Sequence, residues 1–235
     1  GDHRDLHLSL RRQRQMCIRD RYKNAEVPIP ISINKPRSET PNWAAADPRI
    51  TADTIRLIMP AYYGMVKCLD DNIGKILEAL RKNNQIKNTI IVFTSDHGDL
   101  CGEHGRLNKG VPYEGSARIP FVIYCPGKIP AGGVVNEALS CVDFVPTLFS
   151  LTDDKLPKGV EGRDASGLFQ NKSTKWNDIA FLRSTSNSQP WLTVVTDRYK
   201  LIYSSLGKPW PVSYTHLRAH ETRGNLVCRR GLGKK

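Results

Sequence analysis

The chain has 235 residues, a formal net charge of +12 and six cysteines. It contains no run of eighteen or more apolar residues, which excludes an ordinary membrane-spanning helix. The cysteines have neither the spacing of a zinc site nor that of a disulfide framework, so they do not indicate whether the protein works in a reducing or an oxidising compartment. A strongly positive charge favours a nucleic-acid partner, but here much of it lies near the two ends of the chain.

Two short strings near these ends can be encoded by DNA sequences that are reverse complements. Residues 16–20 (MCIRD) can be encoded by ATG TGT ATA AGA GAC, and residues 212–216 (VSYTH) by GTC TCT TAT ACA CAT. The flanking strings RRQRQ and LRAHET resemble translations of the rest of the adapters used in transposon-based sequencing libraries. We therefore predict that residues 1–21 and 212–235 are non-native read-through of adapter DNA.

Without these ends the charge of the chain is unremarkable for a globular protein. Residues 1–21 contribute +3 and residues 212–235 contribute +5, which leaves +4 for residues 22–211. The alternative, a basic arm and a basic tail that bind nucleic acid or membrane, is therefore the weaker interpretation. We expect neither a nucleic-acid nor a membrane partner.

The first half of the remaining chain predicts a loop followed by one long helix. Residues 22–48 contain five prolines with little periodicity, which indicates a connection that crosses a surface. Over residues 51–84, apolar side chains recur at steps of three and four, which predicts an amphipathic helix. Pro60 predicts a kink or a break near its start. Asp70 and Asp71 look like an acidic metal pair but lie opposite the apolar stripe, so we expect them to be solvated.

Two short apolar runs predict strands of an α/β fold. Residues 89–94 (TIIVFT) are β-branched or aromatic and uncharged, which favours a strand buried on both faces of a parallel sheet. Residues 119–124 form a second apolar run that ends at a Cys-Pro-Gly turn. Because a helix precedes the first strand, the order is typical of alternating α/β units.

The last part of the chain predicts a short helix and a hairpin. Residues 143–151 favour a helix with Asp143 at its cap or in its first turn, where a negative charge suits the helix dipole. Residues 191–203 (WLTVVTDRYKLIY) predict a β-hairpin with its turn near Asp197 and Arg198.

The loop after the first strand carries the candidate chemistry. Ligands of open α/β sheets bind beyond the carboxyl ends of strands, where Asp96 offers a hard oxygen ligand and His97 an imidazole that suits manganese, zinc or iron better than calcium. Lys109, thirteen residues after Asp96, is a point charge suited to a sulfate or phosphate oxygen. Taken alone, the tripeptide Asp-His-Gly favours a plain turn after a strand over a metal site. Glu114 and Arg118 are expected to fix the loop against the next strand.

Several strings in this region resemble one protein family in order and spacing. SDHGDLCGEHG, Lys109, YEGSARIPFVIYCPG and VDFVPTLFSL resemble the C-terminal part of the catalytic domain of type I sulfatases, in the alkaline phosphatase superfamily. The resemblance implies an α/β fold with an alkaline-phosphatase-like mixed sheet flanked by helices, present here as a fragment. Residues 22–152 would be part of the catalytic domain, and residues 153–211 a loop-rich segment with part of a small C-terminal antiparallel subdomain.

The same resemblance implies hydrolysis of a sulfate ester, with a sulfated carbohydrate among the candidate substrates. Asp96 and His97 would be two ligands of a divalent cation, with calcium expected and manganese as the alternative. Lys109 would touch a sulfate oxygen. His104 would either donate to the ester oxygen or only form a hydrogen bond to Glu103 or a loop carbonyl, and both roles stay open.

Type I sulfatases also share a Cys/Ser-x-Pro-x-Arg segment whose first residue becomes the formylglycine nucleophile, and these 235 residues do not contain it. We expect this segment, and any export signal, to lie upstream of the chain, and we predict that the chain alone is inactive. The resemblance implies a periplasmic or secreted protein. The alternatives are a phosphonate or phosphate monoester hydrolase of the same superfamily and a non-catalytic remnant.

Overall fold

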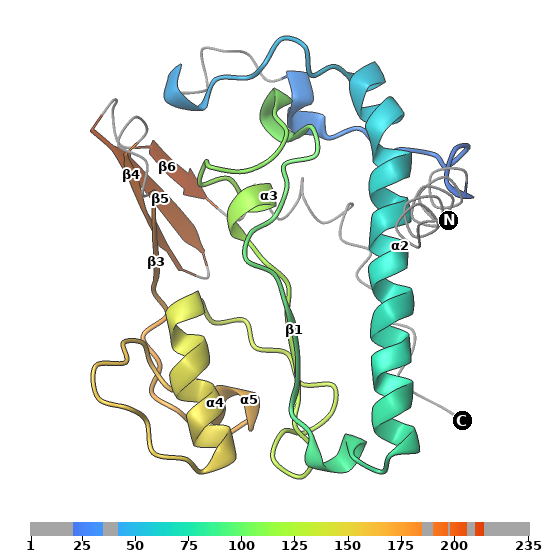
Figure 1. The fold of residues 1–235 in the computed structure, drawn as a ribbon. Coiled ribbons are helices and arrows are strands. Elements are labelled where there is room, and N and C mark those ends of the chain that lie inside the picture. Colours follow the sequence, from blue (N-terminus) through green and yellow to red (C-terminus); the bar gives the residue numbers. More distant parts are fainter. Residues whose placement is uncertain (1–20, 35–41, 185–189, 197, 206–209, 214–235) are drawn as a thin grey trace, which may run out of the picture. The chain divides into compact units, whose positions relative to one another are not determined.

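The computed structural model describes residues 21–34, 42–184, 190–196, 198–205 and 210–213 (Figure 1). The chain divides into two compact units, Gly1–Thr89 with Asp99–Asn108, and Ile90–Gly98 with Lys109–Lys235. The predicted read-through ends lie outside the described residues, apart from Arg21 and the last two residues of one strand. The predicted domain boundaries at residues 152 and 211 stay predictions.

The described part of the first unit is built around one long helix. It contains α2 (Ala52–Lys82) and the 3-10 helices η1 (Ile31–Asn34), η3 (Asn42–Ala44), η4 (Ile86–Asn88) and η5 (Glu103–Gly105). The described part of the second unit contains two sheets and four short helices, one of them a 3-10 helix. Its strands are β1 (Ile91–Thr94), β2 (Phe121–Tyr124), β3 (Ala180–Arg183), β4 (Trp191–Val195), β5 (Tyr199–Ser204) and β6 (Trp210–Ser213), and its helices are α3 (Glu114–Ala117), η6 (Cys141–Asp143), α4 (Phe144–Thr152) and α5 (Ser166–Phe169).

Helix α2 confirms the helix predicted over residues 51–84. Thr51 caps its N-terminus, since the Thr51 hydroxyl accepts a hydrogen bond from the backbone N–H of Thr54 at 3.3 Å. Asp53 lies in the first turn and two basic residues lie in the last turn, as the helix dipole favours. The helix continues through Pro60, so Pro60 does not break it. No helix among the described residues combines the length and apolar composition needed to cross a membrane.

Much of the apolar surface of α2 is exposed. Ile55 is fully buried, whereas several apolar side chains further along have exposed fractions of 50–79% (Leu57, Met65, Val66, Leu69 and Ile76). Asp70 and Asp71 are both exposed and both pair with Lys67, which confirms that they are solvated rather than a metal pair.

Strands β1 and β2 pair with each other in the second unit and correct one expectation. They are antiparallel, with Ile91 opposite Tyr124 and Thr94 opposite Phe121. We expected the first strand to be buried on both faces of a parallel sheet, and for the described residues this expectation is wrong. Only a two-stranded antiparallel piece of the predicted mixed sheet is present among them. Phe93 in β1 is 45% exposed. An apolar run indicates that a strand can be buried, but it does not determine the direction or number of its partners.

The four-stranded sheet has the order β3-β4-β5-β6 and is antiparallel throughout (Figure 1). Strands β4 and β5 confirm the hairpin predicted over residues 191–203, with the backbone N–H of Thr196 donating to the carbonyl of Tyr199 at 2.8 Å; Asp197 lies outside the described residues. Along β5, Lys200, Ile202 and Ser204 are buried and alternate with exposed neighbours. One face of the sheet is therefore packed against the rest of its unit.

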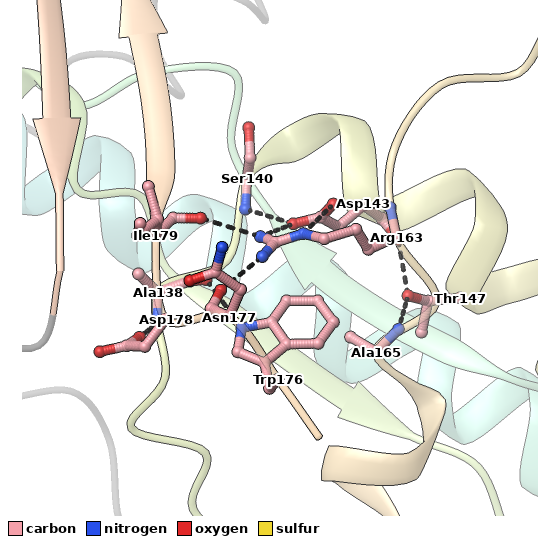
Figure 2. Close-up of polar contacts among 10 residues, drawn as sticks. All are labelled: Ala138, Ser140, Asp143, Thr147, Arg163, Ala165, Trp176, Asn177, Asp178 and Ile179. Atoms are coloured by element: carbon pink, nitrogen blue, oxygen red, sulfur yellow. Dashed lines mark hydrogen bonds and ion pairs between the residues drawn. The ribbon is translucent and has the colours of Figure 1, made fainter. Parts of the chain in front are cut away.

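A polar cluster fixes the start of α4, the helix predicted over residues 143–151 (Figure 2). Asp143 is 3% exposed, and its carboxylate accepts hydrogen bonds from the backbone N–H groups of Ser140 (3.0 Å) and Arg163 (2.8 Å). Arg163 Nη2 lies 2.9 Å from Asp143 Oδ2, and the guanidinium lies 4.0 Å from the centroid of the Trp176 ring. Burial raises the pKa of Asp143, but the hydrogen bonds from Arg163 and Ser140 outweigh this effect and hold it below its usual value.

The same arginine connects α4 to the four-stranded sheet. Its Nη1 donates to the carbonyl of Asn177 at 2.6 Å and its Nη2 to the carbonyl of Ile179 at 3.1 Å, directly before β3. Figure 2 shows these bonds converging on one guanidinium from both sides. A single side chain therefore holds together the start of α4 and the segment before β3, which lie on either side of α5 in the sequence.

We predict that Arg163→Met lowers the free energy of unfolding by about 3 kcal/mol, because it leaves the buried carboxylate of Asp143 without its charged partner. Equilibrium urea unfolding measures this loss. Arg183→Met, which removes an exposed arginine from the same unit, serves as the control and should change stability by less than about 0.5 kcal/mol. Equal stabilities of the two variants would contradict the role given to Arg163.

Candidate functional site

Asp96 and His97, the two predicted metal ligands, lie in the loop directly after β1. The Asp96 side chain is 84% exposed, and its Oδ1 accepts a hydrogen bond from the backbone N–H of His97 at 2.9 Å. This hydrogen bond is the main cause that lowers the pKa of Asp96, and the positive charge of Lys109 adds to the lowering. Asp96 is therefore an ionised, accessible carboxylate at neutral pH.

The imidazole of His97 is oriented by its own loop. Its Nδ1 lies 2.9 Å from the carbonyl oxygen of Gly98, which can only accept a hydrogen bond, so Nδ1 carries the proton. Its Nε2 lies 3.2 Å from Asp96 Oδ2. The Asp96 carboxylate and Nε2 of His97 thus lie side by side, with the tautomer set by a backbone carbonyl.

Helix α3 packs directly against this loop through two glycines. The backbone N–H of Gly98 donates to the carbonyl of Ser116 at 2.9 Å. A Cβ atom on Gly98 would lie 2.0 Å from the carbonyl oxygen of Gly115, so the position admits only glycine without a backbone shift. The glycine therefore lets α3 approach the loop closely.

Lys109 belongs to the same unit as Asp96 and His97, and it is exposed. The segment that follows it leads into α3, whose first residue is Glu114. Glu114 is a buried structural residue as expected, but its charged partner is Lys200 of β5 rather than the next strand. The structure therefore brings together three of the four predicted site residues within one unit.

His104, the fourth predicted residue, lies in the first unit with residues Asp99–Asn108. Its backbone N–H donates to the hydroxyl of Ser32 at 3.1 Å, and its φ of 53° is in the left-handed region. A Cβ on the neighbouring Gly102 would lie 2.7 Å from the side chain of Ile55 on α2. The GEHG string is thus explained in part by packing in the first unit, and the role of His104 stays a prediction.

Asp99 is a structural residue of this loop that sequence reasoning missed. Its carboxylate accepts hydrogen bonds from the backbone N–H groups of Cys101 (2.9 Å) and Asn108 (3.1 Å), which closes the loop on itself. Aspartate often accepts from the backbone N–H two residues later, so this local pattern could have been recognised. Burial, together with the charge of Asp99, raises the pKa of Cys101 to about 12, so this thiol stays protonated and is a poor nucleophile.

Asp96 and His97 together offer ligand atoms that suit a divalent cation, but they are only two residues. Asp96 offers a carboxylate oxygen and His97 an oriented nitrogen, which are ligand types that manganese and, through the carboxylate, calcium accept. Among the residues that the structure describes, no group of three or more His, Cys, Asp or Glu side chains could hold a metal ion. These two residues therefore fit as part of a coordination shell.

The chain is an α/β protein in which a carboxylate and an imidazole, those of Asp96 and His97, follow the end of β1. Lys109 belongs to the same unit. The sulfatase family profile matches residues 23–154, more than half of the chain. The profile of the C-terminal region of N-sulphoglucosamine sulphohydrolase matches residues 102–211. The chain belongs to the sulfatase family, and the resemblance inferred from its motifs is confirmed.

One curated relative and two solved structures illustrate the similarity. An arylsulfatase of Clostridium perfringens is 32% identical over 194 residues, which cover 79% of this chain and 40% of that protein. A protein solved in complex with its substrate D-glucosamine-2-N,6-O-disulfate is 28% identical with a TM-score of 0.61, covering 69% of this chain and 35% of the other. The phosphonate monoester hydrolase of Agrobacterium radiobacter is 25% identical with a TM-score of 0.66, covering 73% and 38%. The chain thus spans less than half the length of each.

We predict that Gly98→Ala destabilises the second unit by about 3 kcal/mol, because the new methyl group would overlap a backbone oxygen of α3. Thermal and urea unfolding measure the effect. Gly133→Ala is the matched control in the same unit, since a Cβ there would meet its nearest neighbours at an ordinary 3.8 Å. If Gly98→Ala were as stable as Gly133→Ala, the close approach of α3 to the loop would be wrong.

Proposed function

We propose that the protein to which this chain belongs hydrolyses sulfate esters with the help of a divalent cation. The observation that supports this proposal is the arrangement of an ionised Asp96, an oriented His97 Nε2 and the positive charge of Lys109 in one unit of a sulfatase-family chain. A divalent cation held by Asp96 and His97, together with the charge of Lys109, would suit a tetrahedral oxyanion that gains negative charge as its ester bond breaks.

Asp96 and His97 would hold the cation through a carboxylate oxygen and Nε2. A bound divalent cation acts as a Lewis acid that polarises a substrate oxygen. Calcium is the ion we propose, and the imidazole of His97 makes manganese the alternative. The hydrogen bond from Nδ1 to the Gly98 carbonyl keeps Nε2 available for this role.

Lys109 would contact a sulfate oxygen as a point charge. Its ammonium group offsets the negative charge that develops on the sulfate oxygens, which lowers the barrier of the chemical step. His104 would either donate to the leaving ester oxygen or serve only the structure of its loop, where its backbone already contacts Ser32. The nucleophile would be a formylglycine made from a Cys/Ser-x-Pro-x-Arg segment, which these 235 residues do not contain.

A sulfated carbohydrate is the substrate class we propose. It is supported by the similarity to a protein solved with D-glucosamine-2-N,6-O-disulfate as its substrate and by the match to the C-terminal region of N-sulphoglucosamine sulphohydrolase. The similarity to a phosphonate monoester hydrolase supports a second candidate activity at the same site. Comparing kcat/KM of the full-length protein for a sulfate ester and a phosphonate monoester with the same leaving group decides between them.

In the full-length protein, Lys109→Ala should lower kcat/KM for a sulfate ester by about two to three orders of magnitude, the usual effect of removing one oxyanion stabiliser. The fold should be retained, because Lys109 is exposed and packs little. Steady-state kinetics together with thermal unfolding measure both quantities. Wild-type kinetics in a folded Lys109→Ala enzyme would remove Lys109 from the site.

Asp96→Asn is the matched comparison for this variant. It should also reduce activity, but through weaker cation binding, so part of the loss should be recovered at high cation concentration. Lys109→Ala should show no such recovery. The same titration of cation against rate therefore separates a metal ligand from a group that contacts sulfate.

The polypeptide of residues 1–235 should show no turnover of any sulfate ester, because positioning and charge stabilisation without a nucleophile leave the covalent step undone. The measurement is release of sulfate or of a chromogenic alcohol at high protein concentration, with and without calcium and manganese. A cation-dependent rate above that of the Asp96→Asn polypeptide would contradict the expectation.

A further inference from the structure

The four-stranded sheet holds the backbone that follows Lys109. The indole Nε1 of Trp191 on β4 donates to the carbonyl of Gly110 at 3.1 Å. The ammonium of Lys200 on β5 donates to the carbonyl of Pro112 at 2.8 Å and pairs with the carboxylate of Glu114. Three residues within five positions of Lys109 are thus anchored, namely Gly110, Pro112 and Glu114. The side chains that anchor them come from β4 and β5, which are far away in the sequence.

The Lys200–Glu114 ion pair is deeply buried. The exposed fractions of the two side chains are 3% and 8%. A buried charge is tolerated only when it is paired and hydrogen-bonded, so each partner requires the other to be in place. Between the anchors, Val111 and Tyr113 are 1% and 5% exposed. Residues 111–114 are therefore a buried, anchored support, whereas Lys109 itself is exposed.

The support also reaches the other side of the candidate site. Glu114 is the first residue of α3, and the carbonyl of Ser116 in the same helix accepts the hydrogen bond from the backbone N–H of Gly98. Gly98 follows His97 directly. One ion pair thus fixes a helix that is bonded to the loop of Asp96 and His97 and is joined to Lys109 by the four residues 110–113.

We propose that Lys200 and Trp191 are positioning residues that set the location of Lys109 relative to the Asp96–His97 loop. The proposal rests on the proposed function for the role of Lys109 in hydrolysis. A lysine has a long flexible side chain, so its ammonium can act on a substrate oxygen only if its backbone is held in place. Misplacement by about 1 Å can reduce a catalysed rate on the order of a hundredfold.

The test uses Lys200→Met in the full-length protein, alone and combined with Lys109→Ala. Lys200→Met should lower kcat/KM for a sulfate ester about tenfold or more. In the Lys109→Ala background the same change should have almost no further effect, because the group that Lys200 positions has already been removed. An equal loss in both backgrounds would show a general structural effect and overturn the proposal.

Two further variants guard against a simple loss of folding. Lys200→Met combined with Glu114→Gln removes the buried charges together and so avoids an unpaired carboxylate. Trp191→Phe keeps an aromatic ring but deletes the bond to Gly110. Both should remain folded by thermal unfolding and both should lose kcat/KM, Trp191→Phe by about threefold to tenfold. Wild-type kinetics in both folded variants would overturn the proposal.

Lys128→Met is the matched control. Lys128 also donates to a backbone carbonyl, that of Leu151, and pairs with a carboxylate, that of Asp153, at the far end of α4. Its loss should leave kcat/KM within about twofold of the wild type. A loss equal to that of Lys200→Met would show that any such pair in the unit has the same effect and would overturn the proposal.

Amide hydrogen exchange tests the support without any need for activity. In Lys200→Met, but not in Lys128→Met, the amides of Gly98, Ser116 and Ala117, which have partners around α3, should exchange faster. Unchanged exchange would overturn the proposal. Faster exchange in a protein whose Lys109→Ala variant keeps wild-type kinetics would uphold the support and place the failure in the proposed function.

Discussion

The buried ion pair between Lys200 and Glu114 is the constraint on which the positions of α3 and of the loop after β1 depend. It joins two residues 86 positions apart, and both side chains are almost inaccessible to water. Removing one partner would leave a charge in a medium that solvates it poorly, so β5 and α3 are required to meet. Because α3 is bonded through Ser116 to Gly98, this requirement extends to the loop after β1.

The continuous motif from Asp96 to Lys109 consists of two physical parts. Asp96, His97 and Lys109 belong to the second unit, whereas Asp99–Asn108 folds within the first. The intervening residues are closed by Asp99 and packed against Ile55 through Gly102. Residues 99–108 of this string therefore have a structural task of their own within the first unit, which spacing in the sequence alone does not reveal.

Patterns in the amino-acid sequence predicted helices, caps and hairpins well. They predicted poorly which distant residues pair with one another. The periodicity of α2, the capping position of Asp143 and the hairpin of β4 and β5 each depend on residues close in the sequence, and the structure agrees with all three. The direction of β1 and the partners of Glu114 and Arg163 depend on residues far away in the sequence. A lysine or arginine in an alternating or loop-rich segment is usually solvated, so nothing in its surroundings signals that it closes a buried cluster.

Lys109 and Lys200 show why residue type alone does not identify a functional group. Lys109 is exposed, with its charge contributing to the low pKa of Asp96. Lys200 is buried, and its donors are used by Pro112 and Glu114. The exposed ammonium keeps the freedom to meet an anionic ligand, while the buried one has exchanged that freedom for fixed geometry. In the proposed function the two roles are complementary, because a mobile charge is useful to an oxyanion only when the backbone that carries it is held in place.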